Sequence, residues 1–403
     1  MSTMNKIKMP QLTLDSVTLP SGEVIPGLKR MLDIALALKD SMMVWSGPGV
    51  GKSQSIMQWN AQKVREHQER ITRGEAVKPW NPTVCDVRLS MKEPVDMQGI
   101  PIPTKSPEGT FQTVWAIPSV WPKDNDEFAG GTIFLDEMNQ GQAAILNAAF
   151  QLVQDRALGE YKIPKGYLIV GAANPSAYNS SVTEFSIPLA NRFTHFNVKA
   201  DFESWLNHSL NNGGNVDVMS FLKTQSPESF LDMSAVKDKV GDEEDTMFTD
   251  LTITPRTWEV IGKLLALPKE QFSLEEKQRY ATGRLGMLLT STLFTYLKDK
   301  ARYQSWQEIL DEGKPFKDES CAAFWNVQMN CLSVIASTTD DKKCRQYVLN
   351  FIEATRKLVN NPYKVVNMQQ LGNLERVKSK PNLYNPFLDA KDLVQIAFAS
   401  LKR

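Results

Sequence analysis

The sequence has few of the residues that build metal sites and disulfide frameworks. Its 403 residues include 3 histidines and 4 cysteines. The histidines lie far apart and the cysteines show no C-x-x-C spacing, so neither a histidine-based metal site nor a disulfide scaffold is expected. Because no secretory signal is visible at the N-terminus, the cysteines are interpreted as reduced thiols of a cytoplasmic protein.

Long apolar runs and an excess of charge of one sign are also missing. No run approaches the roughly 18 residues needed to cross a membrane, so no membrane partner is expected. Lys plus Arg number 46 and Asp plus Glu number 46, which gives a formal net charge of +0. Nucleic-acid-binding domains usually carry a basic surface, so the balance does not favour nucleic acid as a partner. The small cluster of Arg376, Lys378 and Lys380 is expected to be solvated.

The most informative stretch runs from Trp45 to Ser53 and has the pattern of a phosphate-binding loop. The apolar run 42–45 predicts a buried strand before it, and a helix is expected to start at about Gly51. In such a unit, backbone N–H groups and the helix dipole face the phosphates, a lysine reaches the β and γ oxygens, and a serine hydroxyl can ligate Mg²⁺. The residues predicted to bind nucleotide are Gly47, Pro48, Gly49, Val50, Gly51, Lys52 and Ser53.

One residue of this stretch departs from the strict pattern. The pattern requires glycine where this chain has Ser46, which Gly47 then follows. The sequence offers no account of that serine. The alternative interpretation of the stretch is a Gly/Pro turn with a solvent-facing lysine.

An acidic pair ends a second apolar run. Residues 131–135 predict a buried parallel strand, and Asp136 and Glu137 follow at its C-terminal end, the edge at which open α/β sheets bind ligands. Asp136 is predicted to hold Mg²⁺ together with Ser53, and Glu137 to polarise an attacking water. By itself, an apolar run followed by two acidic residues often marks only the end of a strand. Downstream of a phosphate loop it indicates hydrolysis, because Mg²⁺ requires carboxylate oxygens beyond the phosphates.

Three further polar residues are candidates for the same site. Asn174 ends the apolar run 167–173, where it would lie beside the γ-phosphate; the alternative is a turn-former before proline. Arg192 could pair with a phosphate or be an ordinary surface arginine. Arg256 lies just after a predicted helix start, where the helix dipole does not favour a cation, and this misfit suggests another role.

The remaining chain divides by composition. The segment 94–122 is rich in proline and aromatic residues and predicts a structured insertion, either a hairpin packed on its own domain or a loop that touches a substrate. Beyond about residue 200 the pattern is helical, with one long helical stretch at 274–300 and a poorly periodic Asn/Pro-rich stretch at 360–386. The fold class expected is α/β, with a parallel sheet flanked by helices and a mainly helical C-terminal region.

Taken together, these motifs resemble the AAA+ ATPases and, within them, the MoxR family. The resemblance covers roughly residues 28–300. Beyond the generic motifs it rests on the stretches 86–90, 94–99, 135–140, 151–156, 189–193 and 254–258. It implies an N-terminal segment (1–26), an AAA+ P-loop core (27–200) with a helix-2 insertion at about 94–122, a helical lid (201–300) and a helical extension (301–403).

The resemblance also implies roles, cofactors and partners. ATP and Mg²⁺ would be the cofactors, and the chain would hydrolyse ATP in a homo-oligomer, a hexameric ring. The roles implied are Walker A for Lys52 and Ser53, Walker B for Asp136 and Glu137, sensor 1 for Asn174, an arginine finger on the neighbouring subunit's ATP for Arg192, and sensor 2 for Arg256.

Three functions remain open at this point. The first is remodelling of a partner protein, for which a separate protein with a von Willebrand factor A domain is the candidate. The second is a nucleic-acid-associated motor or the NTPase subunit of a restriction or defence complex, which the neutral charge disfavours. The third is a scaffold that binds nucleotide without hydrolysing it, which the acidic pair disfavours.

Overall fold

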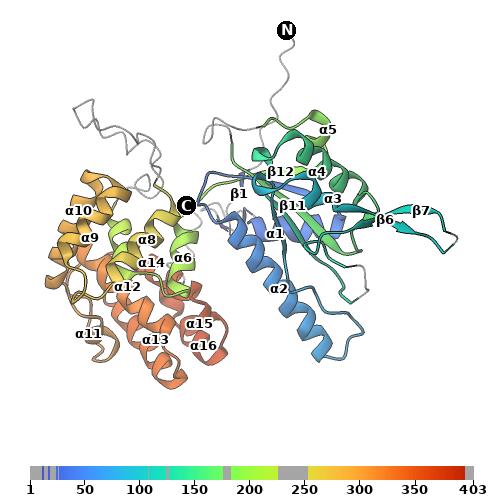
Figure 1. Cartoon of the computed structure of the whole chain (residues 1–403). Coiled ribbons are helices and arrows are strands. Elements are labelled where there is room, and N and C mark those ends of the chain that lie inside the picture. The colour runs from blue at the N-terminus through green and yellow to red at the C-terminus, as the bar shows by residue number, and fades with distance from the viewer. Residues whose placement is uncertain are drawn as a thin grey trace, which may run out of the picture. The chain divides into compact units, whose positions relative to one another are not determined.

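The computed structural model describes residues 11–12, 17–18, 24–25, 27–107, 109–123, 127–175, 183–225 and 253–394. The chain forms two compact units (Figure 1). The first consists of Met1–Val17 and Ile25–Lys199, and the second of Thr18–Val24 and Ala200–Arg403. The division of the second unit into a lid and an extension stays a prediction.

The first unit is built on a six-stranded sheet. Its strands are ordered β1-β12-β4-β11-β8-β5, and each pair is parallel. Because β4, β11 and β8 are neighbours, their C-terminal ends meet at one edge of the sheet. The strands are β1 (Gln11–Leu12), β4 (Met42–Trp45), β5 (Cys85–Arg88), β8 (Gly131–Asp136), β11 (Tyr167–Ala173) and β12 (Thr194–Val198).

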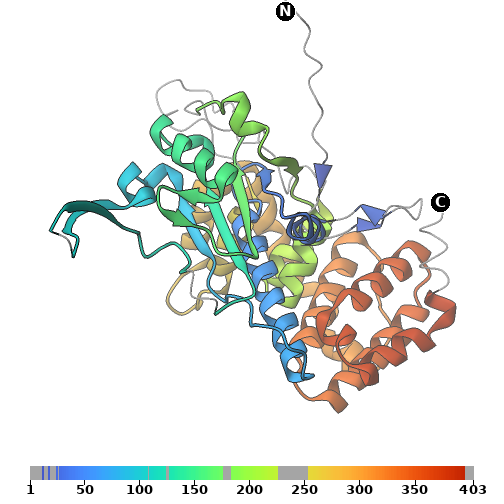
Figure 2. The ribbon, with the colours of Figure 1, turned by 90° about the vertical axis from the view of Figure 1, so that its right-hand side faces the viewer.

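Helices cover both faces of this sheet, which explains why its central strands β4, β8 and β11 are buried along almost their whole length. Alternate residues of β8 show the two faces. The hydroxyl of Thr132 donates to Asn60 of α2 at 2.7 Å, whereas Ile133 and Leu135 pack with the apolar side of α4. Figure 2 shows these layers from the side. The larger helices of the unit are α1 (Leu28–Leu38), α2 (Lys52–Thr72) and α4 (Ala143–Asp155).

Short elements connect the strands and helices of the sheet. The two-residue strands β9 (Ala157–Leu158) and β10 (Tyr161–Lys162) form an antiparallel pair after α4. Near the N-terminus, β2 (Val17–Thr18) and β3 (Val24–Ile25) pair with each other. The one-turn elements are η1 (Leu89–Met91), η2 (Met138–Gln140) and α5 (Ile187–Ala190).

The segment 94–122 is a short helix followed by a β-hairpin. Helix α3 (Pro94–Gln98) leads into the antiparallel strands β6 (Ile100–Lys105) and β7 (Phe111–Ala116), which extend away from the sheet in Figures 1 and 2. Phe111, one of the aromatic residues of this segment, is exposed. Trp121 is instead buried, because its indole N–H donates to the Met97 carbonyl at 2.7 Å and ties the base of the hairpin to α3.

The described part of the second unit is helical and shares one apolar core. This core extends from Trp205 to Leu393, with α12 passing through it. The helices are α6 (Phe202–Asn211), α7 (Val216–Thr224), α8 (Pro255–Ala266), α9 (Leu274–Leu285), α10 (Met287–Asp299), η5 (Lys300–Arg302), α11 (Trp306–Leu310), α12 (Cys321–Ser337), α13 (Asp341–Arg356), α14 (Asn361–Asn373), α15 (Glu375–Lys378) and α16 (Pro381–Asp389).

The structure differs from the sequence-based expectations in two stretches of this unit. The single helical stretch predicted at 274–300 breaks at Gly286, whose φ of 75° ends α9 and starts α10. The stretch 360–386 is mostly helical. Pro362 and Pro381 stand in first turns, where proline is compatible with a helix, and Pro386 lies inside α16. The predicted α/β class, a parallel sheet flanked by helices and followed by a mainly helical region, is confirmed.

Candidate functional site

The loop between β4 and α2 has the backbone of an anion cradle. Gly49 has φ 70° and Gly51, the N-cap of α2, has φ 100°. A side chain at either position would be strained, so the glycines are what allow the chain to turn directly into the helix. The first N–H groups of α2 therefore point into the loop, where the helix dipole favours a negative charge.

The ammonium of Lys52 lies inside this loop. It donates to the Ser46 carbonyl and hydroxyl, both at 3.0 Å, and to Asn174 Oδ1 at 2.7 Å. This placement excludes the alternative of a solvent-facing lysine. It also accounts for Ser46, which is buried and whose hydroxyl accepts from Lys52 while it donates to the Gly47 carbonyl at 2.9 Å.

Ser53 and Asp136 meet across the sheet edge. The Ser53 hydroxyl donates to Asp136 Oδ2 at 3.1 Å, and Asp136 Oδ1 accepts the backbone N–H of Glu137 at 2.9 Å. The carboxylate is thus oriented by two donors, with the serine hydroxyl as its neighbour. Hydroxyl and carboxylate oxygens are the ligands Mg²⁺ prefers, so this pair fits the predicted metal site.

Glu137 is held by a residue that the sequence analysis did not assign. Its backbone has φ 54°, a sparsely populated conformation for a residue other than glycine. The hydroxyl of Ser90, in η1 directly after β5, donates a short hydrogen bond to Glu137 Oε2. Since β5 lies beside β8 in the sheet, Ser90 arrives next to the acidic pair. The signal in the sequence was the stretch 86–90, which resembles the MoxR family but gives Ser90 no role.

Asp86 is a second acidic residue beside Asp136. It lies on β5, and its Oδ1 is buried without a hydrogen-bond partner. Burial raises the pKa of Asp86, the negative charge of Asp136 raises it further, and Arg88 opposes both. The carboxylates of Asp86 and Asp136 therefore make the region next to the serine hydroxyl electronegative, which suits a cation.

Asn174 is positioned by a neighbouring amide. The Asn139 side chain donates to the Asn174 backbone carbonyl at 2.6 Å, which fixes the chain just after β11. The Asn174 amide is thereby directed at Lys52. The alternative that Asn174 only forms a turn before proline does not account for its side chain, because a turn does not require the hydrogen bond with Lys52.

The two arginines are placed differently. Arg192 follows α5 on the first unit and is exposed, and within the described residues its guanidinium has no hydrogen-bond or ion-pair partner. Arg256 belongs to the second unit, where it is exposed in the first turn of α8. Thr254 caps that helix and Pro255 occupies its first turn, which confirms the predicted helix start before Arg256. The first unit thus brings together Lys52, Ser53, Asp136, Glu137 and Asn174, and each arginine is presented to solvent.

The assembled residues fit the groups that the resemblance implies. The loop offers backbone donors and an ammonium for phosphates, and Ser53 with Asp136 offers hard oxygen ligands for Mg²⁺. Among the described residues there is no cluster of three or more His, Cys, Asp or Glu side chains that would hold a metal ion by itself. A cation here would therefore need phosphate oxygens as well, which is how Mg²⁺ usually binds with nucleotides.

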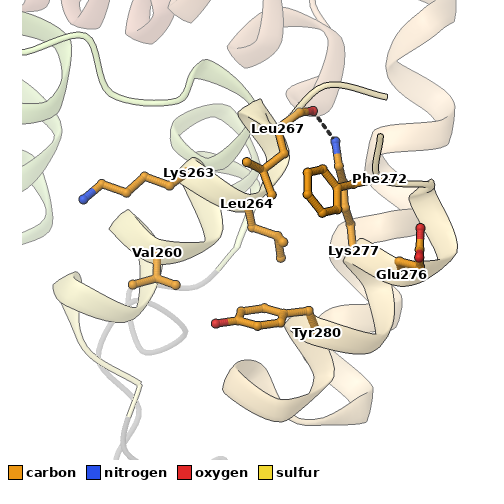
Figure 3. Close-up of a pocket in the computed structure, with 8 residues that line it drawn as sticks. All are labelled: Val260, Lys263, Leu264, Leu267, Phe272, Glu276, Lys277 and Tyr280. Carbon is orange, nitrogen blue, oxygen red and sulfur yellow. Dashed lines mark hydrogen bonds between the residues drawn. The ribbon is translucent and has the colours of Figure 1, made fainter. Parts of the chain in front are cut away.

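A separate pocket of about 410 Å³ lies between α8 and α9 in the second unit (Figure 3). Val260, Leu264, Leu267, Phe272 and Tyr280 make most of its wall apolar. The buried Lys277 points its ammonium away from the pocket's centre and donates to the Leu267 carbonyl at 2.6 Å. Because this lysine caps the end of α8 rather than facing a phosphate, the pocket does not resemble a nucleotide site.

Comparisons with known proteins concern the fold. No protein-family model matches the chain, and no curated protein is similar to it in sequence. NtrX from Brucella abortus in complex with ADP is similar with a TM-score of 0.31 at 13% identity, over 66% of this chain and 64% of NtrX. The Holliday junction branch migration motor RuvB of Thermotoga maritima is similar with a TM-score of 0.28 at 12% identity, over 89% of this chain and 85% of RuvB.

These likenesses are too weak to carry an argument about activity or partners. The chain spans less than two thirds of NtrX, and the MoxR resemblance stays a prediction from the sequence motifs. None of the helices in the described ranges is both long and apolar enough to span a membrane. The function must therefore be argued from the geometry of the site itself.

Proposed function

We propose that the protein hydrolyses ATP in the presence of Mg²⁺. The observation that carries this proposal is the convergence of Lys52, Ser53, Asp136, Glu137 and Asn174 at the edge where β4, β11 and β8 end. Phosphoryl transfer needs a cradle for phosphates, a metal site, a group that orients water and a cation on the γ-phosphate. Each requirement has its own residue in this cluster.

The residues divide the work of the reaction. Lys52 would exchange its contacts with Ser46 for the β and γ oxygens of ATP, while Asn174 holds the ammonium near the γ-phosphate. Ser53 and Asp136 would hold Mg²⁺, which supplies positive charge to the phosphate oxygens when bound. Glu137 would orient the attacking water, with Ser90 fixing the carboxylate that does so.

Arginines from elsewhere would complete the site. The first unit presents Arg192 without a partner among its described residues, which supports a role on the ATP of a neighbouring subunit. Arginine fingers supplied in trans contribute on the order of 10³–10⁵ in rate where they have been measured. We therefore include a homo-oligomeric ring, hexameric as in the family that the chain resembles, in the proposal. Arg256 would act on the γ-phosphate from the helical unit.

The work that hydrolysis drives is proposed to be remodelling of a partner protein, as in the MoxR family. The projecting β6–β7 hairpin, with Ile100 61% and Phe111 74% exposed, offers apolar side chains to such a partner. By the same resemblance, the candidate partner is a separate protein with a von Willebrand factor A domain. A nucleic-acid motor is less well supported, since Arg376 and Lys380, two of the three residues of the small basic cluster, both bind Asp341 instead of facing solvent unpaired.

The test is ATP turnover and nucleotide binding in three variants of the full chain. Lys52→Ala should abolish binding of a fluorescent ATP analogue, and Glu137→Gln should retain binding while turnover stops. Lys165→Ala is the matched control, because Lys165 is exposed and precedes β11, at the opposite edge of the sheet from the loop. Turnover by Glu137→Gln at the wild-type rate would remove that residue from its proposed role.

The oligomeric part of the proposal has its own experiment. Arg192→Ala subunits should bind ATP and turn it over slowly, and adding Glu137→Gln subunits should restore turnover at mixed sites. Such sites would combine Glu137 of one variant with Arg192 of the other. If mixing restores nothing, Arg192 does not act on a neighbouring subunit.

A further inference from the structure

Trp45 and His195 connect the phosphate loop to the segment that carries Arg192. Trp45 is the last residue of β4, directly before the loop, and its indole N–H donates to His195 Nδ1 at 2.9 Å. On the other side of the ring, His195 Nε2 lies 2.7 Å from the Ala190 carbonyl. Ala190 ends α5, two residues before Arg192.

The chemistry of the two partners fixes the form of the histidine. An indole N–H can only donate, and a carbonyl oxygen can only accept. His195 must therefore be neutral, with its hydrogen on Nε2 and its lone pair on Nδ1 directed at Trp45. This one side chain satisfies a donor on β4 and an acceptor on α5 at the same time, which an apolar residue of the same shape would not do.

Aromatic contacts hold both ends of the segment 187–193, which carries Arg192, against Trp45 and His195. The ring of Phe185, just before α5, lies 5.5 Å from that of Trp45. The ring of Phe193, just after Arg192, is buried and lies 6.4 Å from that of His195. The backbone N–H of Arg192 itself donates to the Leu189 carbonyl of α5 at 3.1 Å. The arginine is thus exposed, but the backbone from which it projects rests on Trp45 and His195.

We propose that His195 is a positioning residue that transmits the state of the phosphate loop to Arg192 through Trp45 and Ala190. The inference rests on the proposed function, in which Arg192 serves the ATP of a neighbouring subunit. When nucleotide fills the loop, Lys52 leaves Ser46, the residue after Trp45, so the end of β4 is where rearrangement is expected. The His195 hydrogen bonds then carry that change to α5. As a result, the position of Arg192 at the neighbouring subunit's ATP depends on whether nucleotide occupies the phosphate loop of its own subunit.

Hydrogen–deuterium exchange of the full chain tests the connection without relying on turnover. In the wild type, adding ADP should slow exchange both in the loop, 46–53, and in the segment 187–193. In His195→Phe the loop should still respond and the segment should not. His195→Gln offers a carbonyl to Trp45 and an N–H to Ala190, so it should restore the response. His67→Phe, at the far end of α2, is the matched control for replacing a histidine.

A kinetic arm separates positioning from general damage. His195→Phe should lower kcat about tenfold with KM for ATP changed less than about threefold, and His195→Gln should recover most of the loss. Trp45→Phe, which removes the indole donor but keeps an aromatic ring, should resemble His195→Phe. Mixing His195→Phe subunits with Glu137→Gln subunits should restore turnover, because the intact Arg192 segment then comes from the second variant.

The outcomes distinguish this inference from the proposed function. If ADP protects neither the loop nor the segment in the wild type, nucleotide binding and the inference fail together. If the loop responds and the segment responds equally in the wild type and in His195→Phe, the inference is overturned while nucleotide binding stands. If Arg192→Ala is rescued by mixing but His195→Phe is not, Arg192 acts in trans and His195 does not position it.

Discussion

Lys52 on α2 and Asn174 after β11 form a hydrogen bond of 2.7 Å, although 122 positions of sequence separate them. The contact exists because β4 and β11 are parallel neighbours, so that their C-terminal ends deliver the loop and the asparagine to the same place. An amide oxygen facing an ammonium holds the cation without neutralising it. The lysine therefore retains its full charge for phosphate.

Replacing Asn174 by aspartate should weaken ATP binding. Asn174→Asp keeps the shape of the side chain but places a negative charge beside Lys52 and beside the expected γ-phosphate. Repulsion at such short range in a partly buried site is expected to raise KM for ATP roughly tenfold or more. Asn174→Ala, which removes the amide without adding charge, should lower turnover with a smaller effect on KM. Equal KM values for the two variants would contradict the electrostatic explanation.

Removing the Ser90 hydroxyl should slow hydrolysis while ATP remains bound. Ser90→Ala frees the Glu137 carboxylate, so the water it orients is held less well. The expected loss in kcat is on the order of tenfold, below the ~10²–10⁴ that general acid–base catalysis contributes as a whole. Single-turnover hydrolysis and fluorescent-nucleotide binding measure the two effects separately. Ser106→Ala, on the exposed hairpin, is the control. A loss of binding in Ser90→Ala would show that the hydroxyl supports the loop instead.

The local units of the site could be predicted from the sequence, but several of its contacts could not. Apolar runs that end in Ser46, Asp136 and Asn174 indicate buried strands with polar residues at their C-terminal ends, and glycines mark the loop. The order of the strands is a property of the whole sheet. For that reason, the proximity of Ser90 and Asp86 to Asp136 was visible only once β5 was seen beside β8.

The helical unit shows a different limit of sequence reasoning. Gly286 lies within a continuous helical pattern, and only its backbone conformation shows that it separates α9 from α10. Pro362 and Pro381 suggested irregular chain, although proline fits the first turn of a helix. Helix α14 buries Asn367 and Gln370 along with Leu371, so its apolar periodicity is weak. Buried amides that bond with one another, such as Gln328 with Asn367 at 2.6 Å, replace apolar contacts there.

Neutralising Asp86 should stabilise the protein at neutral pH. Burial and the nearby Asp136 raise the pKa of Asp86, so the folded state binds this proton more strongly than the unfolded state does. The stability that Asp86 contributes is therefore present below the ordinary aspartate pKa and is lost as the pH rises through the raised value. Asp86→Asn removes that loss, so its melting temperature in EDTA should exceed that of the wild type at pH 7.

The pH dependence of this difference provides the check. At pH values below the ordinary aspartate pKa, the wild-type carboxyl is protonated in both states, and the two melting temperatures should converge. Asp155→Asn, an exposed residue at the end of α4, should show no such pattern. A constant difference at all pH values would indicate that packing rather than ionisation of Asp86 is responsible.

Removing the ammonium of Lys277 should destabilise the helical unit. The side chain is 3% exposed and donates to the carbonyls of Leu265 at 3.4 Å and Leu267 at 2.6 Å, which closes the C-terminal end of α8. Lys277→Met keeps the length and apolar stem of the side chain but leaves these carbonyls without their donor. The expected cost is about 1–3 kcal/mol, the penalty for a buried polar group that loses its partner. Lys263→Met, on the exposed rim of the same pocket, should cost much less, and urea unfolding of the two variants measures the difference. Equal stability of both variants would mean that water replaces the lysine at the helix end, and that the capping contact does not hold α8 against α9.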